Sequence, residues 1–372
     1  MNTPLNISLP RQSLPVTAST DKCNNARRST LERMPKWLIC IPLAVQWLWL
    51  TLRYRSATLP SAANPNITSG GLVGEGKLEY FHGMGALALA ATARHCAIAP
   101  ESMPDDEDLL RSMTDAGLTF PVIAKPDLGL CGYGVRRINN LPELRGYLTA
   151  FPPNETVVLQ QYLSQEGEAG IFYARDPHTD QARLIGLALR YFARVTGDGR
   201  RTLAALIAAD ARACRGLNTA QHACELDQAW IPPQGQVVRL STIGSTRVGG
   251  LYRDGAALIT PQLTAAIDII ARDMPQFYCG RFDVRFDSLS DLSAGQGFTI
   301  MEINGAGSEA IQAWDPEIGL LAGFRMIFAK QCLLFAIGHA LRHEGVKPIG
   351  LIALAKLYFK QQRLIAHYPP SN

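Results

Sequence analysis

The sequence predicts an α+β protein, with short strands through the middle of the chain and helices toward its C-terminal end. Residues 120–135 and 157–168 each contain an apolar strand that runs into a turn, and residues 281–304 contain two further short strands. Residues 316–343 and 350–366 are predicted to be helical, the first of them strongly apolar. A chain of 372 residues allows two or three domains and a large core.

The N-terminal part is the least regular in its pattern. Residues 1–35 are expected to be a disordered tail, because the segment is mostly polar and rich in Pro, Ser, Thr and Asn. No signal peptide is predicted at Met1. Residues 36–104 form a second region, which contains an irregular loop over 59–80 and then an alanine-rich helix with a short strand over 87–99.

An apolar segment inside this region, residues 37–52, raises the question of membrane contact. It is shorter than the roughly 20 residues of a spanning helix, and Pro42 and Gln46 interrupt it. Its tryptophans and the basic residues on both flanks suit a membrane interface. The C-terminal helices, over residues 331–372, have enough apolar side chains to bury it instead. We expect this burial, with peripheral membrane contact as the alternative.

A phosphate-binding arrangement is predicted where the first central strand ends. Lys125 stands at the end of that strand, and Gly129, Gly132 and Gly134 follow in the next turn. A lysine at a strand's end can direct its ammonium group at a phosphate, and glycines let backbone N–H groups approach the phosphate oxygens. The next strand contains Gln161, and Glu168 comes seven residues later, after a turn. This order is expected of a hinge that contacts adenine, followed by an acid for the ribose hydroxyls.

A metal site is predicted from the last two strands. Asp283 lies on the first of them, and Glu302 and Asn304 lie on the second. Because Glu302 and Asn304 are two positions apart, they share one side of the pleat. Two carboxylates and an amide oxygen suit Mg²⁺ or Mn²⁺ when the phosphates of a nucleotide supply the remaining ligands. In the alternative interpretation each acid forms an ion pair with a nearby arginine.

These segments together resemble the ATP-grasp superfamily of carboxylate–amine ligases over residues 105–330. Residues 125–135 resemble the phosphate lysine and closing loop of D-alanine–D-alanine ligases. Gln161 stands where that family often has an acid at the adenine hinge, and Glu168 matches its ribose-binding acid. The resemblance implies that Arg281 steadies the reacting phosphoryl group. It also implies that Asp283, Glu302 and Asn304 bind the metal.

Two further stretches resemble the glutathione-type branch of the superfamily, including cyanophycin synthetase. They are residues 194–207, a tight turn before a helix capped by Thr202, and residues 238–250, a glycine-punctuated loop with two arginines. In such relatives these loops lie over the acceptor side of the active site. An ordinary hairpin and loop is the alternative.

Residues 71–77 fit the first seven positions of a P-loop, but Leu78 stands where Ser or Thr must bind Mg²⁺. A P-loop is therefore not expected. Related ligases carry a second ATP lysine on an element before the grasp domain, which is one interpretation of Lys77. The other is a solvated lysine at the start of a helix.

The resemblance implies an ATP-grasp fold in which two subdomains clasp ATP. A short pre-grasp region precedes it, and a helical tail over residues 331–372 follows. It implies an ATP- and Mg-dependent ligase that joins a small carboxylate to an amine through an acylphosphate and releases ADP and phosphate. A phosphotransferase and a nucleotide-binding protein without turnover are the alternatives.

Composition limits the other classes of function. The net charge is +4 with both signs interspersed, so nothing indicates a nucleic-acid partner. The eight cysteines form no Cys-x-x-Cys pair, which argues against a zinc site or a disulfide framework. We expect a cytoplasmic protein, with peripheral location at the inner face of a membrane as the alternative.

Overall fold

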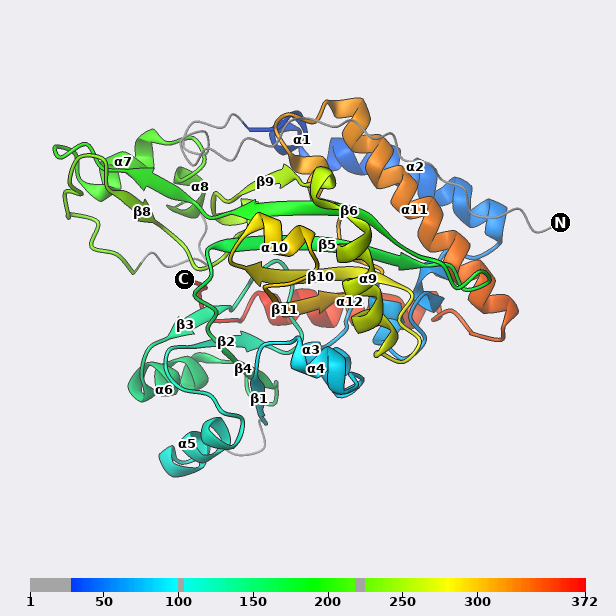
Figure 1. The fold of residues 1–372 in the computed structure, drawn as a ribbon, viewed down its shortest axis with the longest axis horizontal. Helices are drawn as coiled ribbons and strands as arrows, with labels where there is room; N and C mark the ends of the chain where they lie inside the picture. Colours follow the sequence, from blue (N-terminus) through cyan, green and yellow to red (C-terminus); the bar gives the residue numbers. More distant parts are fainter. Residues whose placement is uncertain (1–27, 100–103, 218–224) are drawn as a thin grey trace.

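The computed structural model describes residues 28–99, 104–217 and 225–372 (Figure 1). Within these residues the chain builds a four-stranded sheet, a five-stranded sheet and a two-stranded ribbon. All strand pairs in them are antiparallel. Helices pack on the sheets, so the predicted α+β class is confirmed. Of the expected tail, residues 1–27 lie outside the described part, and α1 (Thr30–Arg33) follows them.

The four-stranded sheet is built from the strands predicted on either side of Lys125. Helices α5 (Asp106–Asp115) and α6 (Leu141–Ala150) pack on it, with Leu109 and Leu144 fully buried in the shared core. Each helix is preceded by an Asp or Asn whose side chain accepts a backbone N–H of the first turn, which is a favourable cap. In spatial order the strands are β1 (His95–Ile98), β4 (Val157–Gln161), β2 (Val122–Pro126) and β3 (Arg136–Ile138).

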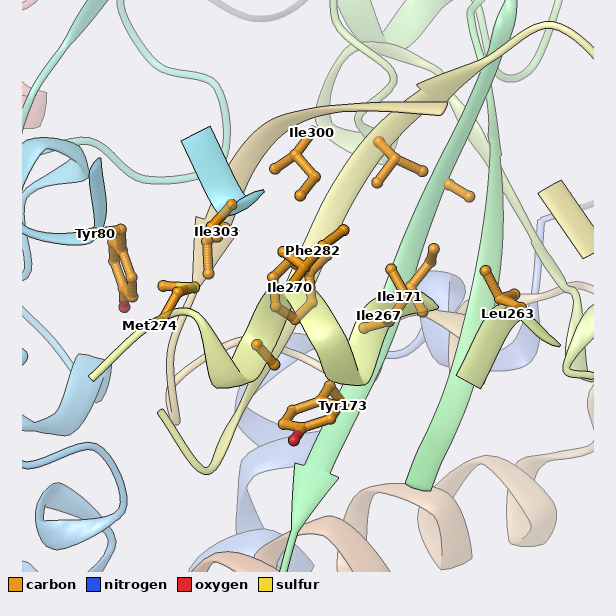
Figure 2. Close-up of a cluster of buried hydrophobic side chains, with 14 of the residues drawn as sticks. Tyr80, Ile171, Tyr173, Leu263, Ile267, Ile270, Met274, Phe282, Ile300 and Ile303 are labelled. Atoms are coloured by element: carbon orange, nitrogen blue, oxygen red, sulfur yellow. The ribbon is translucent and has the colours of Figure 1, made fainter. Parts of the chain in front are cut away.

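The five-stranded sheet carries the main hydrophobic core on one face. Helix α9 (Pro261–Arg272) covers that face with Leu263, Ile267 and Ile270, which pack against strand residues such as Phe282 (Figure 2). In spatial order the strands are β11 (Phe298–Asn304), β10 (Cys279–Phe286), β5 (Gly167–Arg175), β6 (Ala182–Tyr191) and β9 (Leu251–Asp254).

Short helices complete the surroundings of this core. They are α3 (Lys77–His82), α4 (Ala86–Ala90) and α10 (Leu289–Ser293), with the 3₁₀ turn η5 (Ala256–Leu258) beside them. Helix α10 occupies the connection between β10 and β11. Ser288 caps this helix by accepting a hydrogen bond from the Asp291 N–H, and Leu292 anchors it in the core.

Residues 194–207, with the predicted turn and helix, belong to a small separate unit. The ribbon of β7 (Arg194–Thr196) and β8 (Val237–Arg239) packs with α7 (Leu203–Ala209) around its own apolar cluster. The Thr202 side chain accepts a hydrogen bond from Ala205 N–H, so the predicted cap is confirmed. Figure 1 shows this unit at one end of the large sheet, together with α8 (Cys214–Leu217).

The second face of the large sheet is covered at one end by α11 (Leu320–His343), whose Leu333, Leu334 and Ile337 pack against it. The 3₁₀ turns η2 (Leu59–Ala62), η3 (Thr68–Gly71) and η6 (Ile311–Trp314) fill the adjoining space. Helix α2 (Lys36–Tyr54) runs beside α11 and continues through Pro42 (Figure 1). Of the described helices, α2 and α11 are long and apolar enough to cross a membrane, by length and composition alone.

The last helix, α12 (Leu351–Ile365), corrects one expectation. The sequence predicts that it helps to bury residues 37–52, but Leu351 and Ile352 are exposed. Its far end packs instead on the four-stranded sheet, where Ile365 joins the core. Among the described residues, α11 covers one side of the N-terminal segment together with Leu31, Leu59 and Ala313.

Candidate functional site

The candidate site lies on the second face of the large sheet, beyond the end that α11 covers. In β10, Phe282 and Val284 are buried in the core with α9, so the intervening Arg281 and Asp283 point to the opposite face. Strand β10 pairs with β11 on one side and with β5 on the other. Asp283 is therefore flanked by Glu302 of β11 and by Gly170 of β5.

The three predicted metal ligands lie together. Asp283 is paired directly with Glu302 across the β10–β11 ladder, and Arg281 is paired with Asn304. The Asn304 Nδ2 donates to Asp283 Oδ2 at 3.2 Å. A bulge follows Asp283 and shifts the register there.

Asp283 is also held by arginines, as the ion-pair interpretation predicts. The Arg281 Nε donates to Asp283 Oδ1 at 2.6 Å, and its Nη2 donates to Oδ2 at 2.9 Å. Arg190, on β6, has its Nη1 3.3 Å from Asp283 Oδ2 and 3.0 Å from Glu168 Oε1. Arg285 Nη2 lies 3.2 Å from Glu168 Oε2.

The two predicted ATP lysines approach β11 from different elements, Lys77 at Glu302 and Lys125 at Met301. Lys77, the first residue of α3, places its Nζ 3.4 Å from Glu302 Oε1. Lys125 Nζ donates to Gln160 Oε1 at 2.7 Å and to the Met301 carbonyl at 3.0 Å. Lys77 is buried, so the alternative of a solvated helix-start lysine is wrong.

Burial and charge shift the pKa values of these groups in opposite directions. Burial lowers the pKa of Lys125 to about 8 and outweighs the attraction of Glu302. Burial would raise the pKa of Glu302, but the charges of Lys77 and Lys125, joined by those of two arginines, lower it to about 2. Glu302 is therefore an anion at neutral pH.

The segment that mimics a P-loop has a different task in the structure. It follows η3 rather than a strand, and the Gly307 N–H donates to the Gly71 carbonyl. A Cβ at Gly71 would lie 2.6 Å from the Gly305 Cα, so only glycine permits this approach. The contact holds the start of α3 next to the loop that follows Asn304, and this delivers Lys77 to the site.

The predicted glycine loop lies at the edge of the same site. Gly132 and Gly134 have φ of +75° and +72°, a backbone region that favours glycine. A Cβ at Gly129 would lie 2.7 Å from Lys77 Nζ, so this glycine leaves room for the lysine. A Cβ at Gly132 would meet the Ile243 side chain, which places residues 238–250 directly over the loop.

Residues 238–250 connect the two sheets across the site. The Arg247 Nη2 donates to the Gly132 carbonyl at 3.2 Å, and a Cβ at Gly244 would lie 2.8 Å from Glu168 Oε1. The 3₁₀ turn η4 (Thr246–Val248) carries this arginine. The chain's last residues lie alongside, since Arg247 Nη2 also donates to Ser371 Oγ at 2.9 Å.

Gln160, Arg190 and Arg285 belong to the site but were not predicted from the sequence. Gln160 is the buried partner of Lys125, whereas its neighbour Gln161 bonds through its backbone N–H to the Arg94 carbonyl at 2.8 Å. Arg190 bridges Glu168 and Asp283. Strand alternation shows which residues of β6 share a face with Arg190. It does not show whether that face is the one that carries the site, because this depends on the neighbouring strands.

The described site suits a polyanion with a divalent cation. Its ion pairs join four cations, Lys77, Arg190, Arg281 and Arg285, to three anions, Glu168, Asp283 and Glu302. The buried Lys125 lies beside them as a further cation. No group of three or more His, Cys, Asp or Glu side chains in the described residues is arranged to hold a metal alone. The oxygens of Asp283, Glu302 and Asn304 are nevertheless the hard ligands that Mg²⁺ prefers when phosphates complete its shell.

Comparisons with known proteins give structural similarities only. No protein-family model matches the sequence, and no curated protein matches it. Similar solved structures include a bifunctional glutathione synthetase from Pasteurella multocida, with 17% identity over 68% of this chain and a TM-score of 0.33. A D-alanine–D-alanine ligase from Bacillus anthracis has 12% identity over 76% of this chain and 72% of its own, with a TM-score of 0.42.

The same ligase complexed with ATP has 14% identity over 71% of this chain and 65% of its own, with a TM-score of 0.37. This chain spans 35% of the length of the glutathione synthetase.

Proposed function

We propose that this protein is an ATP- and Mg-dependent ligase that joins a carboxylate to an amine through an acylphosphate intermediate. The observation that carries the proposal is the approach of two lysines to β11 beside a glycine loop: Lys77 contacts Glu302, and Lys125 donates to the Met301 carbonyl. Cations on two separate elements, with backbone N–H groups between them, are what a triphosphate needs.

The excess of positive charge supports a nucleotide as the ligand. Two lysine ammonium groups near the glycine loop would bind phosphate oxygens, and each such charged hydrogen bond contributes about 1.5–3 kcal/mol. Asp283, Glu302 and Asn304 would hold the divalent cation, which would neutralise phosphate charge when bound. Asp283 would have to share its oxygens with Arg281, which holds both of them in this structure.

The predicted ribose contact of Glu168 remains a prediction. Both of its carboxylate oxygens face arginines in the structure, Arg190 at 3.0 Å and Arg285 at 3.2 Å. A ribose hydroxyl would have to be accepted next to these partners. The adenine contact expected near Gln161 likewise remains a prediction.

In the proposed reaction the protein supplies charge and position rather than a nucleophile. An oxygen of the substrate carboxylate attacks the γ-phosphorus, the bond to the bridging oxygen breaks, and ADP leaves with the electron pair. The amine nitrogen then attacks the acyl carbon, loses a proton, and the C–O bond to phosphate breaks. Arg281 and the two lysines would stabilise negative charge during phosphoryl transfer.

A screen for ADP release tests the reaction class. Amino acids and small carboxylates are added in pairs with amines, with ATP and Mg²⁺, and ADP and free phosphate are measured. A ligase forms both products only when acid and amine are present together. ADP without free phosphate, with a hydroxyl acceptor, would indicate a phosphotransferase. ATP binding without turnover across the screen would indicate a nucleotide-binding protein.

The nucleotide site has its own test. Lys125→Ala should reduce ATP affinity by about tenfold or more, measured by calorimetry with Mg²⁺, because it removes a charged contact with phosphate. Lys347→Ala, which changes an exposed lysine on the connection after α11, is the matched control and should leave the affinity unchanged. Equal affinity in the folded Lys125 variant and the wild type would mean that the phosphates bind elsewhere.

A further inference from the structure

Helix α2 presents a continuous apolar face to solvent. Trp37 is 67% exposed, Leu48 is 63% exposed and Leu52 is 78% exposed, so the face extends along the whole helix. The exposed large apolar residues recur at helical spacing: Trp37, Leu38, Ile41, Val45, Leu48, Trp49 and Leu52. Monomeric soluble proteins rarely leave a contiguous patch of this kind in water.

The exposed face is distinct from the side of α2 that packs on the protein. Ile39 and Leu50 are buried in clusters shared with α11. The Gln46 Nε2 donates to the Phe328 carbonyl at 2.9 Å, and Trp47 packs edge-on against Phe335. Helix α2 is thus apolar both toward the protein and toward solvent, unlike a surface helix with one polar face.

Basic side chains frame this face at both ends. Arg33 and Lys36 are exposed at the start of α2, and Arg53 and Arg55 are exposed at its end. The Arg53 guanidinium lies 5.4 Å from the centre of the exposed Trp49 ring. Tryptophans next to cations are typical of helices that lie at the headgroup level of a bilayer.

The same region offers no exposed acid. Within residues 28–58 the acidic side chain is Glu32 alone, and its side chain is buried. Glu32 is neutralised by Arg212 Nη2 at 2.8 Å and by Arg215 Nη1 at 3.0 Å. The exposed charges within residues 28–58 are therefore all positive, which complements an anionic surface.

We propose that the exposed face of α2 docks this protein on an anionic phospholipid membrane, with the helix lying in the interface plane. The apolar residues enter the headgroup boundary, and the four framing cations contact lipid phosphates. The opposite side of α2 stays bound to α11 through Gln46 and Trp47. Those contacts tie the helix to the protein and favour surface binding over a span.

A second copy of the chain fits this face less well. Pairing two α2 helices in either direction would bring the cations of one copy toward those of the other, with no exposed acid on residues 28–58 to compensate them. An anionic membrane satisfies both the apolar face and its basic frame. The docking proposal does not depend on the proposed enzymatic function.

Flotation of the full-length chain with vesicles tests the proposal. Vesicles of phosphatidylcholine alone are compared with vesicles that also contain phosphatidylglycerol. Binding should need the anionic lipid, weaken with salt, and shift the tryptophan emission to shorter wavelength. The variant Ile41→Ser/Leu48→Ser/Leu52→Ser should bind about tenfold more weakly or worse, because it removes apolar groups that enter the bilayer boundary.

Matched variants distinguish docking through α2 from nonspecific hydrophobic adsorption to vesicles. Leu87→Ser/Ile269→Ser changes exposed apolar residues elsewhere on the surface and should bind vesicles as the wild type does. Lys36→Glu/Arg53→Glu should lose the preference for anionic lipid. All the changed residues are exposed, so the melting temperatures should stay near the wild-type value. A variant that melted early would be replaced by the single Leu52→Ser substitution.

Three results would overturn the proposal. The first is no flotation with anionic vesicles. The second is a soluble dimer that the Ile41→Ser/Leu48→Ser/Leu52→Ser variant dissociates, which would assign the face to a second copy. The third is protein that high salt and alkaline carbonate cannot remove from vesicles and only detergent releases, which would make α2 a spanning helix.

Discussion

Glu302 is the side chain on which the electrostatics of the candidate site converge. It lies opposite Asp283 in the ladder, and Lys77 reaches it from α3. Cations rather than acids dominate its surroundings, and they hold the pKa of its carboxyl at about 2 despite burial. The Glu302 carboxylate therefore stabilises the folded chain at neutral pH through its cationic neighbours.

Glu302→Gln should lower the free energy of unfolding at neutral pH by about 1 kcal/mol, a value suited to an ion pair with a partly exposed member. Because the pKa of Glu302 is lowered in the folded state, its contribution is present above about 4.5 and is lost as pH falls toward 2. Urea unfolding of both proteins at pH 7 and pH 3 checks this.

The difference in unfolding free energy between the wild type and the Glu302→Gln variant should shrink at the lower pH. Glu344→Gln, at an exposed position after α11, should have no effect at either pH. A Glu302→Gln variant as stable as the wild type at pH 7 would show that the lysines do not stabilise this carboxylate.

The glycine loop couples its own conformation to the loop above it. Gly132 and Gly235 have nearly equal φ, +75° and +79°. A Cβ added at Gly132 would lie 2.9 Å from Ile243 Cγ2, whereas a Cβ added at Gly235 would have no atom within 4 Å. The two positions separate backbone strain from contact between loops.

Gly235→Ala should cost about 1 kcal/mol of unfolding free energy, the strain of a left-handed backbone alone. Gly132→Ala should cost more and should also weaken ATP binding, because it pushes residues 238–250 away from the loop. Chemical denaturation and ATP calorimetry on the pair measure the two effects. Equal losses in both variants, with unchanged ATP affinity, would mean that the loops act independently.

Local pattern was enough to predict the strands that carry the site and not enough to predict its partners. The strand that contains Lys125 runs into a glycine turn, and the strands that contain Asp283 and Glu302 alternate apolar and polar residues. Both signals depend only on residues that are neighbours in the sequence. Arg190 and Gln160 reach the site through pairing between strands that are distant in sequence. The alternation of apolar and polar residues within one strand does not show which strand it pairs with. The helix predicted over residues 350–366 is present as α12, but the prediction that it packs on residues 37–52 was wrong for the same reason. An apolar helix can pack on any of several cores of similar polarity.

The two sheets are joined by more than the loops that carry the site. The large sheet lies between α9 and α11, and the small sheet has a core of its own. Helix α12 and the residues that follow it contact the small sheet and the glycine loop. The Gln361 Nε2 donates to the Gly129 carbonyl at 3.1 Å, and the Tyr368 hydroxyl donates to the Leu128 carbonyl at 2.6 Å.

The final residues extend this link to the other side of the site. The Thr242 N–H donates to the Asn372 carbonyl at 3.2 Å, and the Arg137 N–H donates to Asn372 Oδ1 at 2.9 Å. Residues 368–372 therefore hold the small sheet, the glycine loop and residues 238–250 in one arrangement. They form a strap that bridges these three segments.

Removing residues 369–372 should loosen the site while leaving both cores in place. Tyr368 stays stacked on Phe151, so the melting temperature should fall only slightly. Hydrogen exchange over residues 129–135 and 238–250 should become faster, because the hydrogen bonds that Arg137, Thr242 and Arg247 donate to Ser371 and Asn372 are lost. ATP should dissociate several times faster in stopped-flow measurements, while Pro370→Ala, an exposed change that keeps the strap, should match the wild type. Unchanged exchange in both loops would show that they are held by their own contacts and that the strap is only a covering.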